Sequence, residues 1–379
     1  MPRHLSELPT EESSAPKTHL LLLVSGLAGS PANWEVMMES LNLHADTSRV
    51  ALLASGANTR TQTLHGIDTC GQRLAQEVQE YIMKHPSLER LSIVAHSMGG
   101  LVCRYFIGRA YDPATKRIAG LQPVHFFAMA TPHAGCSGYG ITQVPFFSLF
   151  DYVPLLGPLI RRAVAAMAPP LSALFMRRTG AQFFLHDREG GRPPLIERLS
   201  RDIKREGLFM TALASFITRT AYANSSGDHL ISWPNSSLRR ISELPKLPLG
   251  GIGVVRADPL DIAYWPNYCP QGAEPSWREQ LREADSQDLS ETAQLTSSSQ
   301  HDQISRGDSA LTLDMISRLQ ALPWRRVDVS FKGAKSWSST HNLIQVTKRR
   351  WHYVGVGVGR HLARQFAIME ALEQQTSST

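Results

Sequence analysis

The chain alternates short, mostly apolar runs with segments of helical periodicity. Between the runs, Asp68–Lys84 places Leu74, Val78 and Tyr81 at helical spacing. Nearly continuous apolar runs are typical of strands buried on both faces of a parallel sheet. Strand and helix in alternation predict an α/β fold, with a mostly parallel central sheet and helices on both faces. The expected strands are Leu20–Val24, Val50–Ala54, Leu91–His96, Val124–Ala130, Thr220–Asn224 and Val327–Phe331.

Two stretches interrupt this alternation. Residues 141–178 are apolar but broken by prolines, which favours short helices over one long helix, and we expect a cap or lid insertion over residues 141–200. Gln271–Asp308 is rich in Ser, Gln, Glu and Asp, a composition that predicts a disordered insertion. We therefore expect a polar, disordered N-terminal tail (residues 1–17) and one domain over residues 18–375 that contains both insertions.

Composition narrows the class of protein further. The formal net charge of +6 is modest for 379 residues and the basic residues form no long run, so we expect no nucleic-acid partner. Four scattered cysteines indicate a reducing compartment rather than a disulfide framework. Without a leader-like N-terminus or an apolar run of about 18–20 residues, we expect a cytoplasmic protein.

The strongest chemical signal is the segment Ala95-His96-Ser97-Met98-Gly99-Gly100, between an expected strand and an expected helix. A nucleophile elbow, G-x-S-x-G, needs small residues two before and two after the serine because its strand-to-helix turn is strained. Gly99 matches the motif, and Ala95 replaces the leading glycine with a residue that is still small. A chance turn could also contain S-x-G, but the flanking strand and helix favour Ser97 as a nucleophile.

A nucleophilic serine needs a base and an acid, which follow it in this order: Ser, Asp or Glu, His. Asp228 follows the expected strand Thr220–Asn224 within Asn-Ser-Ser-Gly-Asp, where the alternative is a simple Asx-turn. Asp202 is a weaker candidate because no strand precedes it. Asp258 follows Ile252–Val255, a run flanked and interrupted by glycines, so Asp228 is preferred.

The base must come from the five histidines after Asp228. His341 follows the expected strand Val327–Phe331 through a polar loop, which is where the base of the last loop belongs, and we predict it to be the base. His229 adjoins the acid, and His301 lies in the predicted disordered insertion. His352 and His361 fall within residues 351–366, which we expect to be a strand running into the last helix.

An oxyanion hole needs two backbone donors. The N–H of Met98 and that of Leu27, in the loop Ser25-Gly26-Leu27-Ala28-Gly29 after an early strand, are the candidates. That glycine loop matches neither G-x-G-x-x-G nor G-x-x-x-x-G-K-[ST], and the histidines lack metal-ligand spacing such as H-E-x-x-H. We therefore expect neither a cofactor nor a metal.

Three other features have simpler interpretations. His125 lies inside an apolar run and is expected to be a core histidine, whereas His133, after Ala130-Thr131-Pro132, is expected at the rim of the site. The alternating glycines of Gly355–Gly359 are expected to let a strand pack closely where it runs into a helix. Lys348-Arg349-Arg350 is expected to be a solvated face, with attraction to a membrane surface as the alternative.

Several motifs in one order resemble a known family. HSMGGLVCRYFIG, MATPHAG, YANSSGD and THNLI, together with the early GLAGSPANW, are similar to the lipase-like serine esterases of eukaryotes, which are α/β-hydrolases. The resemblance covers about Leu20–Asn235 and resumes at Val327. It implies that Ser97, Asp228 and His341 are the triad. The chain departs from the family at Ser25-Gly26-Leu27, where such lipases commonly have His-Gly-Leu, so the backbone donor is kept but the shape of the hole differs.

The sequence thus leads to one functional expectation with open alternatives. We expect an α/β-hydrolase that cleaves carboxylic esters through an acyl-enzyme, with acyl-ester lipids as substrates and peripheral contact with membranes. A thioesterase or peptidase would use the same residues. A catalytically silent α/β-hydrolase that binds lipid or protein is the alternative from another class.

Overall fold

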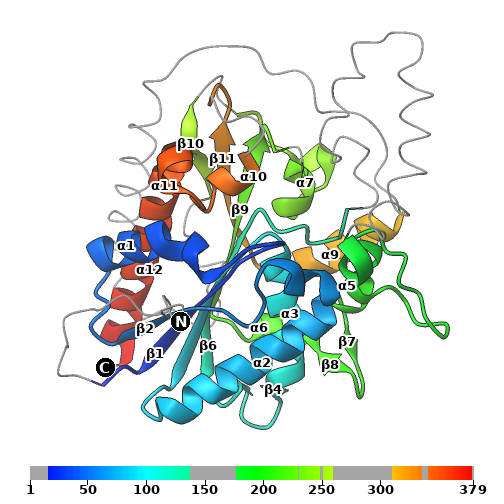
Figure 1. The fold of residues 1–379 in the computed structure, drawn as a ribbon, viewed down its shortest axis with the longest axis horizontal. Helices are drawn as coiled ribbons and strands as arrows, with labels where there is room; N and C mark the ends of the chain where they lie inside the picture. The colour runs from blue at the N-terminus through cyan, green and yellow to red at the C-terminus, as the bar shows by residue number, and fades with distance from the viewer. Residues whose placement is uncertain are drawn as a thin grey trace.

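The computed structural model describes residues 16–136, 176–228, 230–247, 251–258, 310–334 and 340–377. Most of the predicted N-terminal tail, cap and low-complexity insertion lies outside these ranges, as do His229 and His301. Within them, seven strands form one sheet in the order β10-β11-β9-β6-β3-β1-β2 (Figure 1). The strands are β1 (His19–Val24), β2 (Val50–Ala54), β3 (Arg90–His96), β6 (Gln122–Met129), β9 (Thr218–Ser226), β10 (Ile252–Ala257) and β11 (Arg325–Phe331).

Neighbouring strands in this sheet are parallel except for β10, which pairs antiparallel with β11. The side chains of β1 explain why its apolar run is continuous. Leu20 and Leu22 enter the core on one face of the sheet, whereas Leu21 and Leu23 enter the core on the other. Because successive side chains of a strand point to opposite faces, a strand covered on both sides needs apolar residues at every position. The predicted α/β fold and the predicted strands are confirmed.

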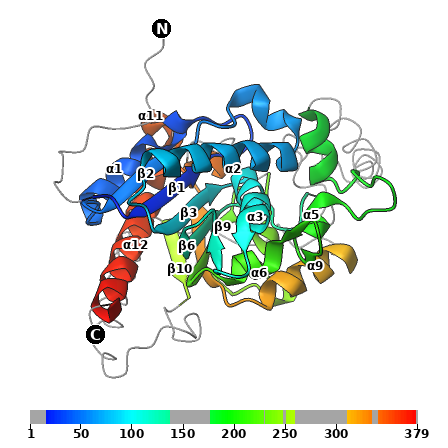
Figure 2. The same ribbon diagram turned by 90° about the horizontal axis from the view of Figure 1, so that it is seen from below.

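Helices cover both faces of the sheet (Figure 2). On one face, α1 (Glu35–His44) packs with the C-terminal helix α12 (Val356–Ser377). The other face is covered by four helices: α2 (Ile67–Lys84), α3 (Met98–Ala110), α6 (Phe209–Ala214) and α9 (Ala310–Gln320). The sheet is therefore the middle of three layers, as expected for a parallel sheet.

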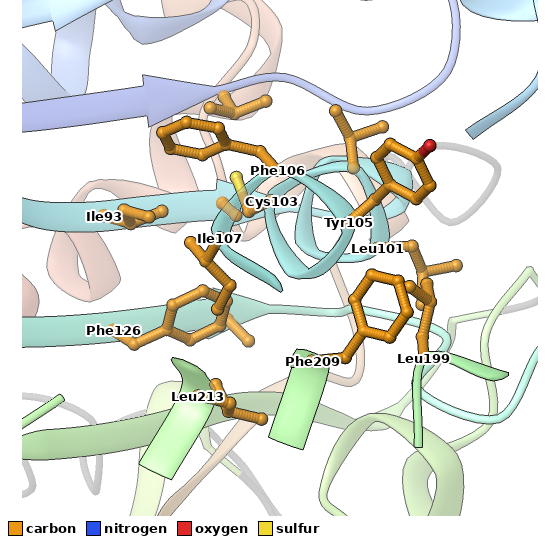
Figure 3. Packing of buried hydrophobic residues seen from close by; sticks show 14 of the residues in the cluster. Ile93, Leu101, Cys103, Tyr105, Phe106, Ile107, Phe126, Leu199, Phe209 and Leu213 are labelled. Carbon is orange, nitrogen blue, oxygen red and sulfur yellow. The ribbon is translucent and has the colours of Figure 1, made fainter. Parts of the chain in front are cut away.

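Helix α3 belongs to the layer formed by α2, α3, α6 and α9, and its residues from Met98 to Gly108 are all buried. Ile107 packs next to Phe126 of β6, Phe106 lies in the same core, and the centroid of the Tyr105 ring lies 6.0 Å from that of Phe209 (Figure 3). A side chain at Gly108 would come within 2.2 Å of the Phe209 ring, so a glycine is needed for this close approach. Burying each such aromatic side chain contributes about 1.5–3 kcal/mol. The helix that begins directly after Ser97 is thus held rigidly against the sheet.

Short elements complete the described chain. Two small hairpins pair β4 (Tyr111–Asp112) with β5 (Arg117–Ile118) and β7 (Asp202–Ile203) with β8 (Gly207–Leu208). The short helices are η1 (Pro31–Trp34), η2 (Arg60–His65), α5 (Leu195–Arg198), α7 (Trp233–Ser236), η5 (Ile241–Glu243), α10 (Thr340–Leu343), α11 (Arg349–His352) and η8 (Tyr353–Gly355). In the described part of the predicted cap, Leu195, Ile196 and Leu199 are buried in the same core as α3. Among the described residues, no helix is long and apolar enough to cross a membrane.

Two expectations for the C-terminal half need correction. Residues 351–366 contain no strand, because they form the end of α11, η8 and the start of α12. The run Ile252–Val255, which was not included among the expected strands because glycines flank and interrupt it, is part of the antiparallel edge strand β10 (Ile252–Ala257). An edge position tolerates Gly253 because a single neighbouring strand pairs with it.

The glycines of residues 355–359 differ in what surrounds them. A Cβ on Gly355 would lie 1.8 Å from the carbonyl oxygen of Leu343, whereas a Cβ on Gly357 would meet nothing within 4 Å. Gly355 therefore permits a close approach between η8 and α10, the helix that contains His341. The expected close packing is confirmed at Gly355, although helix rather than strand provides it.

We expect Gly355→Ala to destabilise the protein by about 1–3 kcal/mol, since its methyl group must displace the backbone at Leu343. Gly357→Ala is the matched control. It adds the same methyl group to open space within α12 and should stabilise the protein by up to about 1 kcal/mol. Urea unfolding of both variants measures the difference. Equal stability of the two variants would contradict the proposed contact.

Candidate active site

Ser97 lies at the junction between β3 and α3, at the carboxyl edge of the parallel strands. Its backbone has φ 54° and ψ −127°, an unusual conformation for a residue other than glycine. The backbone N–H of Ser97 donates to the carbonyl of Met129, at the end of β6, at 2.8 Å. The adjacent parallel strand thus supports the strained turn, which has the geometry of a nucleophile elbow.

Small residues around this turn have a steric cause. A Cβ on Gly99 would lie 2.4 Å from the carbonyl oxygen of Val24, so α3 could not start this close to β1 with any other residue at that position. Gly26 is equally constrained, because its Cβ would lie 2.7 Å from that of Ser97. The loop after β1 therefore lies directly against Ser97. The sequence motif identified Gly99, whereas the contact of Gly26 emerges only from the fold.

Ser97, His341 and Asp228 form a hydrogen-bonded chain. The Oγ of Ser97 lies 2.7 Å from Nε2 of His341, and Nδ1 of His341 lies 2.8 Å from Oδ2 of Asp228. A carboxylate can only accept, so Nδ1 carries the proton and Nε2 is left to accept from the serine hydroxyl. All three residues are largely buried. This geometry allows a serine hydroxyl to transfer its proton to an oriented imidazole.

Asp228 is held in its ionised form. Burial by itself would raise the pKa of this carboxyl, but His341 and two backbone donors outweigh it, so the pKa lies below its ordinary value. Oδ1 accepts from the backbone N–H groups of Leu230 and Ile231, both at 2.9 Å. The Asx-turn considered as an alternative is thus present together with the contact to His341. The turn uses Oδ1 of Asp228, whereas the contact uses Oδ2.

The other candidate acids lie elsewhere. Oδ1 of Asp202 accepts from Met210 and Thr211 at the start of α6. Asp258 follows the antiparallel strand β10, and its Oδ2 accepts from the backbone N–H of Arg326, near the start of β11. The start of β11 is at the opposite edge of the sheet from Ser97. Strand direction therefore separates Asp258 from the site.

We expect Asp228→Asn to lower kcat by about 10⁴-fold with the fold intact, because an amide cannot hold His341 in the correct tautomer. The control is Asp258→Asn, which weakens an ion pair with Arg256 (2.8 Å) and should reduce stability but not turnover. Steady-state kinetics and thermal unfolding of both variants check this. Loss of activity in Asp258→Asn at an unchanged Tm would contradict the assignment.

The other described histidines lie outside this chain of groups. Nδ1 of His361 is 2.9 Å from the hydroxyl of Tyr222 in the core, and Nδ1 of His352 is 2.9 Å from the hydroxyl of Thr347. His125 is a core histidine as expected, with Nδ1 at 2.8 Å from Oγ1 of Thr218. The expectation for His133 is wrong. It does not line the rim but is fully buried, with its ring edge-on to Trp324 at 5.4 Å.

The loop after β1 has a defined shape. The backbone N–H of Ala28 donates to Oγ1 of Thr63 at 3.0 Å, and the hydroxyl of Ser25 donates to the carbonyl of Ser30 at 3.0 Å. Gly26 contacts Ser97, and Leu27 is the next residue in the chain. The roles of Leu27 and Met98 as oxyanion donors remain predictions. Among the described residues, no group of His, Cys, Asp and Glu is placed to hold a metal ion.

A serine, acid and base in this chain order on a mostly parallel, helix-covered sheet define the α/β-hydrolase class. The chain belongs to the family described as "Putative serine esterase (DUF676)", whose model matches residues 14–238. This range includes Ser97 and Asp228 but ends before His341. The match therefore supports the class, while the pairing of the base depends on the fold.

Curated relatives carry similar descriptions. "Putative lipase YDL109C" of Saccharomyces cerevisiae is 26% identical over 71% of this chain and 37% of its own length. "Putative lipase C4A8.10" of Schizosaccharomyces pombe is 27% identical over 36% of this chain and 18% of its own. The chain thus spans well under half the length of these relatives. Among solved structures, "a putative lipase (lip1) from Acinetobacter baumannii AYE" matches at 14% identity, 58% of this chain, 70% of that chain and TM-score 0.31.

Proposed function

We propose that the protein is a serine hydrolase that cleaves carboxylic esters, with acyl lipids as the substrate class. The observation that carries the proposal is the contact of Ser97 Oγ with His341 Nε2 at 2.7 Å. The other nitrogen of the same ring, Nδ1, contacts Oδ2 of Asp228. A serine hydroxyl is a weak nucleophile until a positioned base takes its proton. Membership of a serine esterase family and relatives named as lipases support the ester and lipid parts of the proposal.

The mechanism follows from the atoms that are in contact. Ser97 Oγ attacks the acyl carbon while His341 Nε2 takes its proton, and the ionised Asp228 stabilises the imidazolium that forms. The backbone N–H groups of Met98 and Leu27 bind the oxyanion. His341 then protonates the leaving alkoxide, which departs as an alcohol. A water molecule, deprotonated by His341, then attacks the acyl carbon. The bond to Ser97 Oγ breaks, His341 returns the proton to Oγ, and the acyl group leaves as a carboxylic acid.

The test compares four substrate types on the purified full chain. These are a short soluble ester, a long-chain acyl ester in phosphatidylcholine vesicles, a thioester and a peptide amide. We expect the long-chain ester in vesicles to be turned over fastest, and Ser97→Ala to be inactive on all four. We further propose that the protein is cytoplasmic and reaches its substrate by peripheral contact with membranes. Faster turnover of the thioester or amide than of both esters would contradict the ester assignment.

A further inference from the structure

The base of the site is also held through its backbone. His96, the last residue of β3, places Nε2 2.9 Å from the carbonyl oxygen of His341. The two imidazole rings lie 4.9 Å apart at an angle of 42°. The residue before the nucleophile is therefore in direct contact with the base, although it is 245 positions away in the chain.

The chemistry of this contact allows a single arrangement. A carbonyl oxygen can only accept, so the proton of the neutral His96 ring is on Nε2. His96 is 3% exposed, and burial lowers its pKa to about 3. It is therefore a neutral donor throughout the pH range in which a serine hydrolase works, and it adds no positive charge beside His341.

A second contact holds the same short helix from the other side. The hydroxyl of Thr340, the residue before His341, donates to the carbonyl of Gly227, the residue before Asp228. A Cβ on Gly227 would lie 3.2 Å from the Thr340 methyl group, so the two backbones lie close together. Each member of the triad is thus preceded by a residue that takes part in one of two ties around α10.

Helix α10 is also held by Leu343, which lies in the core and approaches Gly355 of η8, but neither contact involves His341 itself. It contains four residues, Thr340–Leu343, and is not part of the sheet. Ser97 and Asp228, in contrast, directly follow strands or strand ends within the sheet. Because a displacement of about 1 Å can cost about 10²-fold in rate, the position of the His341 backbone has to be set by contacts outside α10.

We propose that His96 is a positioning residue that, together with Thr340, sets the His341 backbone so that Nε2 meets Ser97 while Nδ1 meets Asp228. This inference rests on the proposed hydrolase function for its kinetic consequences, but the geometry it describes can be measured without turnover. The alternative is that His96 only fills the space beneath the elbow.

The experiment compares His96→Leu, which removes the donor but fills the space, with His96→Gln, which keeps an N–H near the position of Nε2. Kinetics on the short soluble ester give kcat and KM, a fluorophosphonate probe gives the rate of Ser97 labelling, and thermal unfolding gives Tm. We expect His96→Leu to lower kcat and the labelling rate by about 10²-fold with KM nearly unchanged. His96→Gln should recover most of this loss at a similar Tm.

A second pair keeps the test independent of how well His96→Leu folds. Thr340→Val removes the hydroxyl at constant shape and should also lower kcat, whereas Thr340→Ser should restore it. Wild-type kcat in folded His96→Leu, or a His96→Gln variant as slow as His96→Leu, would overturn the proposal. Wild-type kcat in Thr340→Val would overturn the part assigned to Thr340.

A readout without turnover separates this proposal from the proposed function. The proton shared by His341 Nδ1 and Asp228 gives a low-field NMR resonance, which should broaden or move in His96→Leu and return in His96→Gln. If wild-type protein neither labels nor hydrolyses esters but the resonance behaves this way, the hydrolase function fails and the positioning role stands. An unchanged resonance in folded His96→Leu would overturn the positioning role.

Discussion

Replacing Ser97 with alanine is expected to lower kcat for ester hydrolysis by about 10⁶-fold, because the three residues of the triad act as a unit. The change removes the Oγ that lies 2.7 Å from Nε2 of His341. It keeps the Cβ that lies against Gly26, so the fold should remain intact. Covalent labelling by a fluorophosphonate probe and the rate of ester hydrolysis measure the loss.

The structure provides a demanding control for this prediction. Ser92 Oγ lies 2.8 Å from Nε2 of His19, whose Nδ1 lies 3.0 Å from Glu370, so a second Ser-His-Glu arrangement exists in the core. Ser92 is fully buried, and its Oγ also accepts from the backbone N–H of His125. We therefore expect Ser92→Ala to keep its probe labelling. Labelling that survives in a folded Ser97→Ala protein would mean that another nucleophile exists.

Replacing His341 with alanine should be nearly as damaging, about 10⁶-fold in kcat, because Ser97 then lacks a base. The matched control is His352→Ala. His352 is the last residue of α11, and its Nδ1 accepts from the backbone N–H of Lys348 at 3.2 Å, so its loss should affect the local turn rather than the chemistry.

Kinetics of both histidine variants on the short soluble ester check this assignment, with thermal unfolding to confirm that each is folded. The expected order is wild type, then His352→Ala at a similar rate, and His341→Ala about 10⁶-fold slower but still above the uncatalysed rate, because the oxyanion hole remains. If His352→Ala abolished turnover while His341→Ala kept it, the base would have been assigned to the wrong residue.

Much of the fold could be predicted because its signals are local. A strand buried on both faces has to be apolar at nearly every position. The run Leu20–Val24 has this pattern, so it can be recognised as a buried strand without knowing which strands pair with it. The elbow at Ser97 could be recognised from its local motif, whereas the reason for the glycine at position 99 is the approach of α3 to β1. The prediction failed where tertiary context decided the conformation, as in residues 351–366, which were expected to begin as a strand but form helices.

The site shows the same division. Chain order and loop position were enough to prefer Asp228 and His341. In the structure His341 lies within hydrogen-bond distance of both Asp228 and Ser97. Asp258 was ranked below Asp228 only because glycines flank and interrupt the run before it, since nothing in that run reveals that its strand is antiparallel. His133 was misplaced for a related reason. A residue after a strand end can face the site or the core, and the packing against Trp324 decides between them.

The sequence by itself therefore determined the class of fold and the position of every strand of the large sheet except β10, because periodicity acts between residues close in the chain. It also predicted Ser97 as the nucleophile from a local motif. Only the tertiary structure decided which acid reaches the base, that Gly26 contacts Ser97, and that His96 and Thr340 hold the backbone around His341. Those outcomes depend on strand direction and on contacts between residues far apart in the chain, such as the 113 positions that separate Asp228 from His341. No local pattern carries that information.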